Sequence, residues 1–443
     1  MRASLAADAD AGRPTRTAQS SAIGAQPQSQ HVKPGTPFVE TTTEASATAA
    51  WRDAIYELSE FPRPSASEGE RRAAEWIAAR LRALGCESAV EQERAHGGYW
   101  WPLGLANLLA LAAGLLVRRD GVGRARRALA VLASGTAAAA LWDDLGHGRR
   151  WFRRALLPKR ATWNVLAYAG DPDARRTVVL IAHHDAAHSG LVFHPALGQL
   201  APRYLPRLHE RSSRTLPVLY GVWLGPVAIC LGALARARGL VRAGSALALG
   251  ALAAMVDIGE RGVVPGANDN LAAVGVLLAI AERLRAEPLP GVRVLLLSTG
   301  SEESFSEGMQ AFGERHFPEL DRDTTEFICL ECLGGPTLIV LEGEGMLRMR
   351  TYPQATRDAL ANAAAAEGVS VTRGLRTVAA CDALIALRAG YPVATLASID
   401  ATKLPLNYHW PSDTPAALHW RTIEDAIAVC ERLLRERSDG ARG

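Results

Sequence analysis

Short apolar runs recur along the chain at wide spacing, bounded by polar or turn-forming residues. Runs of this length that are rich in Val, Ile and Leu are typical of buried strands. Between or after them lie longer stretches whose apolar period is that of a helix. The predicted strands are Asn164–Tyr168, Thr177–Ala182, Val292–Ser298, Glu326–Cys332 and Pro392–Ser398, and the predicted helices are Leu271–Arg285, Thr356–Glu367 and Thr422–Arg437. This alternation predicts an α/β fold, a three-layer sandwich around a mostly parallel central sheet.

A further helix is predicted near the start of the ordered part of the chain. Ser67 and Glu70 have the spacing of a capping box, in which two side chains satisfy free backbone N–H groups of the first turn. Ile77 and Leu81 then fall on one helical face. Gly85 follows the last apolar position and predicts a left-handed C-terminal cap.

The hydrophobic pattern changes in two long segments that predict helical hairpins. The arms are Tyr99–Val117 with Ala128–Trp142, and Leu216–Ala235 with Ala243–Val256. A bilayer crossing needs about 20 apolar residues, a length that the first arms meet, whereas the second arms are shorter and rich in Ala. Trp and Tyr near the hairpin ends are typical of a membrane interface. The alternative is four buried helices in a soluble cap; the length rule favours membrane hairpins that contact a lipid bilayer.

Domain boundaries follow from these segments. Residues 49–95, 160–202 and 258–443 are expected to form one domain, with inserted hairpins at 99–142 and 203–257. Arginines flank both ends of each hairpin, so the positive-inside rule does not predict its orientation. Residues 1–48 lack an apolar period and predict a disordered tail without the apolar core of a secretory signal.

Composition adds few constraints. The chain has 443 residues and a formal net charge of +3, so charge gives no basis for nucleic acid as a partner. The six cysteines are scattered through the chain and do not resemble the framework of a small disulfide-rich domain.

Candidate metal ligands follow several predicted strands or stand beside predicted helices. A lone His or acid in such a place is more often a solvated surface group than a ligand. Five such positions in one chain are harder to dismiss, because two imidazoles and three carboxylates are groups that zinc takes. The candidates are His183, Asp269, Glu303, Glu331 and His409, with Glu302 next to Glu303 and Asp185 two residues after His183.

Several motifs together resemble a known family. They are "NVLAYAG", "AHHD", "GANDN", "STGSEES", "LECLGG", "CDALIALRAGYPV" and "YHWPSDTP", and they span about residues 160–190 and 262–420. In this order they resemble the co-catalytic zinc exopeptidases related to bacterial leucyl aminopeptidase and aminopeptidase Y. Both hydrophobic hairpins lie outside the resemblance, as insertions.

The resemblance implies a role for each candidate residue. Asp269 is expected to bridge two Zn²⁺ ions, with His183 and Glu303 completing one ion and Glu331 and His409 the other. Glu302 is expected to be the general base that takes a proton from a metal-activated water. Asp185 is expected to hold His183 in the required tautomer.

Some positions depart from the family pattern or compete with it. Glu331 stands where relatives usually carry Asp, which leaves the metal spacing open. His184 and His188 flank His183 and are alternative ligands, but His183 has the expected spacing to Asp185. The remaining expectations are that Cys329 and Cys332 are core residues, that Asp382 and Asp413 hydrogen-bond loops, and that Asn270 braces the metal loop.

The sequence therefore predicts a membrane-associated zinc exopeptidase, aminopeptidase-like, that hydrolyses N-terminal peptide bonds of peptide substrates. By resemblance, the expected location is a bacterial cell membrane. One alternative is another reaction on the same fold, by a carboxypeptidase or by a glutaminyl cyclase with one zinc. The other is a non-catalytic membrane scaffold.

Overall fold

The computed structural model describes residues 50–119, 121–217 and 219–440. All of them belong to one compact unit of the chain, Ala45–Gly443. The tail predicted at residues 1–48 lies outside the described residues.

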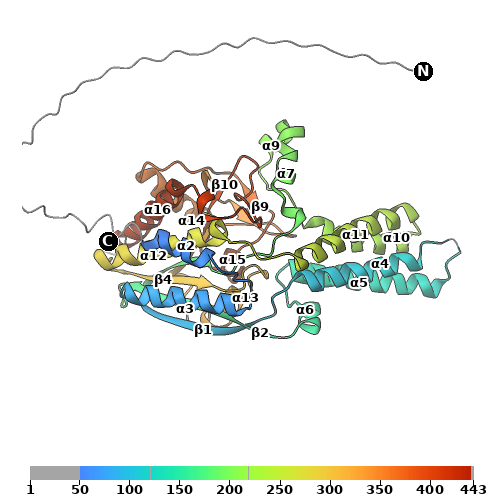
Figure 1. Ribbon diagram of the computed structural model, residues 1–443, viewed down its shortest axis with the longest axis horizontal. Coiled ribbons are helices and arrows are strands. Elements are labelled where there is room, and N and C mark those ends of the chain that lie inside the picture. Colours follow the sequence, from blue (N-terminus) through green and yellow to red (C-terminus); the bar gives the residue numbers. More distant parts are fainter. Residues whose placement is uncertain (1–49, 120, 218, 441–443) are drawn as a thin grey trace, which may run out of the picture. The chain divides into compact units, whose positions relative to one another are not determined.

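A mixed sheet forms the centre of this unit, with the strand order β1-β2-β4-β3-β5-β10-β6 (Figure 1). The four strands β4, β3, β5 and β10 pair in parallel, whereas β1, β2 and β6 add antiparallel pairs at the two edges. The bounds are β1 Glu87–Ala95, β2 Arg160–Gly170, β3 Arg176–His183, β4 Val292–Thr299, β5 Thr325–Glu331, β6 Thr337–Val340 and β10 Val393–Ile399. A small second sheet contains β7 Gly343–Glu344, β8 Arg350–Thr351 and β9 Arg376–Thr377.

All five predicted strands are present, as β2, β3, β4, β5 and β10. The predictions missed β1, because this edge strand carries charged residues and only its last residue is buried. They also missed β6 and the small sheet, whose strands are too short to show a period.

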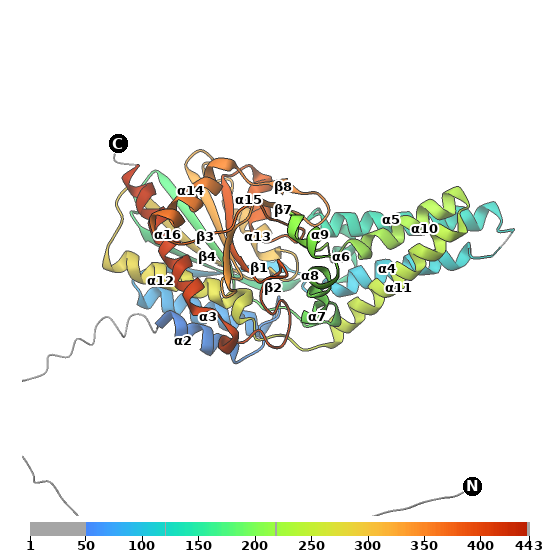
Figure 2. The same cartoon turned by 90° about the horizontal axis from the view of Figure 1, so that it is seen from above.

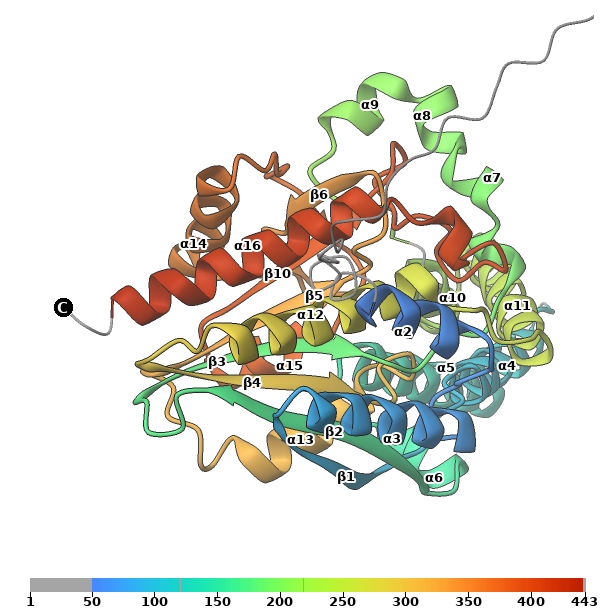
Figure 3. The same cartoon turned by 60° about the vertical axis from the view of Figure 1, so that its left-hand side comes forward.

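Helices cover both faces of the sheet and complete the predicted three-layer sandwich (Figure 3). One face packs against α2 Ala50–Ser59, α3 Glu68–Ala83, α12 Ala272–Ala286, α14 Gln354–Ala366 and α16 Trp420–Asp439. The other face packs against α13 Glu307–His316 and α15 Ala383–Ala389. Leu180 and Val179 show why the core has two halves, since neighbouring residues of a strand point to opposite faces.

Helix α3 begins as predicted, but only half of the predicted capping box forms. The Ser67 hydroxyl accepts a hydrogen bond from the Glu70 backbone N–H. The Glu70 carboxylate does not return this bond to Ser67; it accepts the N–H of Ala66 and reaches into the core. Gly85 has a φ of +88° and supplies the predicted left-handed end.

Four apolar helices form a bundle beside the sandwich (Figure 2). They are α4 Trp100–Leu116, α5 Arg124–Leu145, α10 Tyr220–Ala235 and α11 Arg238–Glu260. We call these four helices the bundle, and its sandwich-side end the base. The helices approach closely at small residues: a Cβ atom on Gly225 would lie 2.8 Å from the backbone nitrogen of Ala248.

The predicted lengths of the hairpin arms were wrong. The second arms, α5 and α11, are the longer ones, with 22 and 23 residues, whereas α4 and α10 have 17 and 16. The apolar runs had suggested that the first arms are the longer ones. They underestimated α5 and α11, because these helices continue through charged residues at their ends. By length and composition, α5 and α11 could cross a membrane.

Short helices surround the base of the bundle. One is α6 Trp151–Leu156, which follows α5. The others lie in a segment, residues 191–214, that we call the flap. It contains η1 Leu191–Phe193, α7 Pro195–Gly198, α8 Leu200–Tyr204 and α9 Pro206–Arg211.

Candidate active site

The candidate ligands meet at the carboxyl ends of the parallel strands. His183 is the last residue of β3, and Glu331 is the last residue of β5. Glu302 and Glu303 follow β4, where a positive φ at Ser301 turns the chain away from the sheet. Adjacent parallel strands end at the same edge of a sheet, so local strand positions alone bring these groups together.

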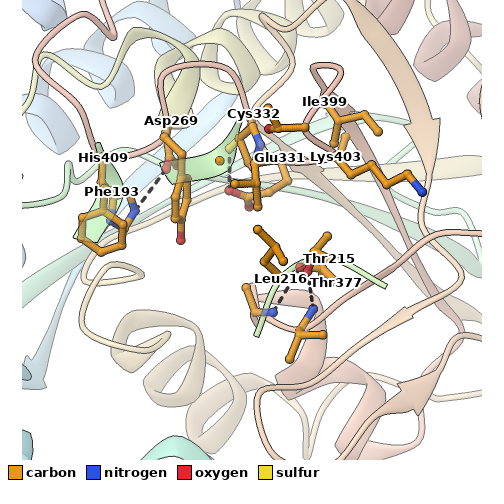
Figure 4. Close-up of a pocket in the computed structure, with 18 of the residues that line it drawn as sticks. Phe193, Thr215, Leu216, Asp269, Glu331, Cys332, Thr377, Ile399, Lys403 and His409 are labelled. Atoms are coloured by element: carbon orange, nitrogen blue, oxygen red, sulfur yellow. Dashed lines mark hydrogen bonds and ion pairs between the residues drawn. The ribbon is translucent and has the colours of Figure 1, made fainter. Parts of the chain in front are cut away.

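Asp269 lies between the two histidines. It precedes α12, and its peptide bond to Asn270 is cis. One carboxylate oxygen, Oδ1, is 3.1 Å from His183 Nε2, and the other, Oδ2, is 3.4 Å from His409 Nε2 (Figure 4). A carboxylate with one oxygen on each side is the arrangement that a bridging ligand requires.

The remaining two carboxylates divide between the histidines. Glu331 Oε1 is 3.5 Å from His183 Nε2, and Glu303 Oε2 is 3.1 Å from His409 Nε2. The pairing that we had expected, His183 with Glu303 and Glu331 with His409, stays a prediction. Glu303 also has an oxygen within 4.8 Å of ligand atoms of His183 and Asp269. The longer side chain of Glu331, in place of the usual Asp, reaches the site.

The charge of the cluster suits divalent cations. Burial raises the pKa of Glu303 to about 7 and that of Glu331 above its usual value. Although burial alone would lower the pKa of His409, Glu303 and Asp269 outweigh it and raise that pKa to about 10. The carboxylates therefore attract positive charge. Either protonated histidines or metal ions can supply that charge, and a metal ion that binds displaces the protons from the histidines. The buried Oε1 of Glu303 has no hydrogen-bond partner, so a ligand position is open.

Two further acids hold the ligand-bearing backbone in place. Asp185 accepts the backbone N–H groups of Glu302 and Glu303 at 3.0 and 3.1 Å, and its Oδ1 lies 3.4 Å from His183 Nδ1. Asp185 thus contacts the His183 ring, as expected, and also fixes the turn after β4. Asp413 accepts the N–H groups of Asn268 and Asp269 at 2.7 and 3.1 Å.

The other bracing residues also make contacts of the expected kind. Asn270 donates to the Leu330 carbonyl and accepts the Cys332 N–H, which ties the Asp269 loop to the end of β5. Asp382 accepts a hydrogen bond from the Thr299 hydroxyl at the end of β4.

The competing ligands point elsewhere. His184 Nδ1 lies 2.9 Å from Ser298 Oγ, and burial lowers the pKa of His184 to about 3. His188 Nδ1 lies 2.9 Å from the Arg261 carbonyl oxygen. Cys329 and Cys332 are buried, as expected for core residues.

Two buried residues of the site were missed by the sequence analysis. Arg63 donates to the carbonyl oxygens of Leu58, His184, Pro265 and Gly266, and so connects loops on both sides of the metal cluster. The Glu70 carboxylate accepts the backbone N–H and the hydroxyl of Ser301. Apart from Leu58, these partners are more than a hundred residues away in the chain, so the contacts have no sequence signal.

A pocket of about 240 Å³ opens beside the cluster. Asp269, Glu302, Glu331 and His409 are among its polar lining residues (Figure 4). Its other walls are mainly apolar, and they include Phe193, Leu216, Phe305, Met346 and Ile399. Such a pocket suits an apolar group held next to the metal cluster.

A buried charge network connects the first hairpin to the turn that carries Glu302. Arg153, in α6, forms an ion pair with Asp144 of α5 at 2.6 Å and donates to the Ser304 carbonyl at 2.7 Å. Glu307 lies 3.6 Å from the guanidinium groups of Arg150 and Arg153, and 3.0 Å from His96 Nδ1. Burial alone raises the pKa of Glu307, but the bond from His96 and the two arginines hold it well below its usual value.

We expect Glu307→Gln to lower the free energy of unfolding by about 3–5 kcal/mol, because it removes one partner of a buried charge network. Thermal unfolding of the purified protein in detergent measures this change. Glu314→Gln, at an exposed position of the same helix, is the matched control and should leave the midpoint nearly unchanged. Equal midpoints for the two variants would contradict a structural role for the network.

Known proteins resemble the chain in sequence and in fold. Residues 253–434 match the sequence model of peptidase family M28. Among solved structures, the fold is similar to an aminopeptidase from Aneurinibacillus sp. strain AM-1, with 13% identity, a TM-score of 0.50, and coverage of 89% of this chain and 94% of that chain. None of the curated proteins compared with the sequence matches it.

Two further structures show the same fold. The zinc aminopeptidase BSAP from Bacillus subtilis has 14% identity and a TM-score of 0.51, with coverage of 88% of this chain and 95% of that chain. A glutaminyl cyclase from Tannerella forsythia has 14% identity and a TM-score of 0.50, with coverage of 88% and 97%. The resemblance to zinc exopeptidases is thereby confirmed: residues 253–434 match the model of peptidase family M28, and the fold is shared with these zinc peptidase structures.

Proposed function

We propose that this protein is a zinc-dependent, aminopeptidase-like exopeptidase that removes N-terminal residues from peptides. The central observation is the position of Asp269, whose two oxygens face His183 and His409 beside an apolar pocket. A free peptide N-terminus with its first side chain in this pocket would present its first peptide bond to the metal cluster.

The positions of the side chains suggest which residues would hold the ions. His183 and His409 would each hold one zinc ion together with Asp269, and Glu303 and Glu331 would supply the remaining carboxylate ligands. When bound, the zinc ions would polarise the scissile carbonyl and lower the pKa of a water molecule. Imidazole and carboxylate groups are ordinary zinc ligands, so the residues present fit this cofactor.

Glu302 is the residue best placed to act as the general base. Its carboxylate lies 3.9 Å from His183 Nε2 and has a long hydrogen bond, 3.5 Å, from Ser306 Oγ. Asp185 fixes the backbone N–H groups of Glu302 and Glu303 and so holds the turn that carries both acids. With the turn held, Glu303 can reach the ligand cluster while Glu302 remains available to accept a proton. In the proposed reaction Glu302 takes a proton from the attacking water and transfers it to the leaving amine.

Activity and metal content test this proposal together. The protein purified in detergent should hydrolyse amino-acid arylamides, lose that activity when a chelator removes the metal, and regain it with zinc. Metal analysis should find two zinc ions per chain. One zinc ion with cyclisation of N-terminal glutamine would instead support a glutaminyl cyclase, and activity unchanged by the chelator would contradict both assignments.

We further propose that the bundle anchors the protein in a lipid bilayer. Large aliphatic side chains cover its outer surface, including Leu115, Leu132, Leu234 and Leu249, with 59% to 68% of their surface exposed. Its interior is lined instead by small residues such as Ala106, Ala110 and Ala137. Leucines outside and small residues inside are typical of membrane helices, whereas a soluble bundle has the opposite arrangement.

A further inference from the structure

The flap exposes several large apolar side chains. The exposed fractions are 46% for Leu197, 47% for Leu200, 65% for Tyr204, 57% for Leu205 and 66% for Leu208. Scattered exposed leucines are ordinary, but this density within a dozen residues is typical of an interaction surface.

The charge of the flap is almost entirely positive. Within residues 191–214 the single acidic residue is Glu210. Four arginines accompany it, and all four are exposed: Arg203, Arg207, Arg211 and Arg214. Leucine and tyrosine combined with arginine suit an anionic phospholipid surface, where the apolar groups enter the interface and the guanidinium groups meet phosphate.

The flap lies where such a surface would be. Figures 1 and 2 both place α7 and α9 at the level of the base along the long axis of the bundle, and Figure 1 shows them standing off to one side of it; α6 lies near the same end. Trp101 at the start of α4, Trp142 at the end of α5 and Trp151 in α6 are also exposed at this end, by 44% to 50%. Exposed Trp and Tyr at one level mark a membrane interface. From this level α5 and α11 extend about 33–35 Å at 1.5 Å per residue, enough for a hydrocarbon core of about 30 Å.

The inner side of the flap contacts the metal site. The Phe193 ring packs against the His409 ring, with centroids 4.5 Å apart, and His194 packs against Trp410 at 4.7 Å. At the other end of the flap, Lys403 donates to the carbonyl oxygens of His209, Glu210 and Ser212. The flap is therefore attached at both ends to the loop that carries His409.

We propose that the flap docks on the anionic phospholipid surface beside the bundle, with Tyr204 and Leu208 at the level of the headgroups. This inference concerns a surface separate from the metal cluster, and it does not depend on peptidase activity.

Depth-dependent quenching of single labels tests the docking. The full-length protein is reconstituted into phosphatidylcholine vesicles, with or without phosphatidylglycerol, after a thiol-reactive fluorophore is attached to Tyr204→Cys or Leu208→Cys. The described cysteines are buried except for the half-buried Cys230, so the unsubstituted protein gives the background. Leu132→Cys reports insertion of the bundle, and Arg285→Cys, at the end of α12, is the matched exposed control.

Flap labels should be quenched by nitroxides on lipid headgroups and protected from aqueous iodide, more strongly with phosphatidylglycerol. The label on Arg285→Cys should be quenched by aqueous iodide and not by nitroxides on lipid headgroups. Flap labels that stay accessible to iodide while the Leu132→Cys label is quenched by lipid would overturn the docking but leave the anchor intact. Unlabelled Tyr204→Cys protein that forms a disulfide-linked dimer in the vesicles on addition of a mild oxidant would also overturn it.

The arginines provide an independent check on the lipid. Each arginine near an anionic surface contributes about fivefold to binding. The double variant Arg203→Gln/Arg207→Gln should therefore shift the docking equilibrium by about 25-fold toward the iodide-accessible state. The control Arg82→Gln/Arg285→Gln changes the net charge equally at exposed positions outside the flap and should have no effect. Equal effects of the two double variants would contradict recognition of phospholipid by the flap.

Discussion

Glu302→Gln should lower kcat for arylamide hydrolysis by about 10²–10⁴-fold, the range that general-base catalysis typically contributes. Gln has nearly the same shape as Glu but cannot take a proton from water. The Glu302 carboxylate is buried in the pocket, and this burial raises its pKa well above the usual value. The five proposed ligands are unchanged in this variant, so zinc content should remain at two ions per chain.

The measurement compares kcat, KM and zinc content of the variant with those of Glu319→Gln, an exposed position on the surface. The control should retain full activity and full metal content. If Glu302→Gln keeps its activity, Glu302 is not the base. If it loses activity and zinc together, Glu302 is a ligand rather than a base.

Asp269→Asn should remove both metal and activity, because a single carboxylate would serve both ions. An amide offers one neutral oxygen where the carboxylate places a charged oxygen on each side. The loss of activity should exceed the roughly 10–100-fold that removal of an outer-shell partner costs. Zinc content after dialysis should fall for both ions, and not for one alone.

The matched control for this variant is Asp173→Asn, at an exposed turn between β2 and β3. Circular dichroism and thermal unfolding establish that the fold of Asp269→Asn persists without metal. Retention of one zinc ion at full occupancy would show that Asp269 binds a single ion, and the bridging role would then be wrong.

The sandwich core could be read from the sequence because its strands are buried on both faces. Runs such as Val294–Leu297 are apolar without interruption, and the structure places β4 at Val292–Thr299. β1 could not be found in this way, since its charged residues reflect an edge that faces solvent. The arms of the bundle were misjudged for a related reason: α5 continues past the apolar run to Asp144, whose charge is balanced by Arg153 from a later helix.

The sequence by itself predicted the candidate metal ligands and the buried strands at whose ends several of them lie. Only the tertiary structure decided that Asp269 places one carboxylate oxygen near His183 and the other near His409, because these three residues are far apart in the chain. It alone also revealed the buried Arg63 and Glu70 and the two-sided flap. The local pattern of hydrophobic and polar residues indicates whether a residue is buried, whereas residues more than a hundred positions apart come into contact only when the chain has folded.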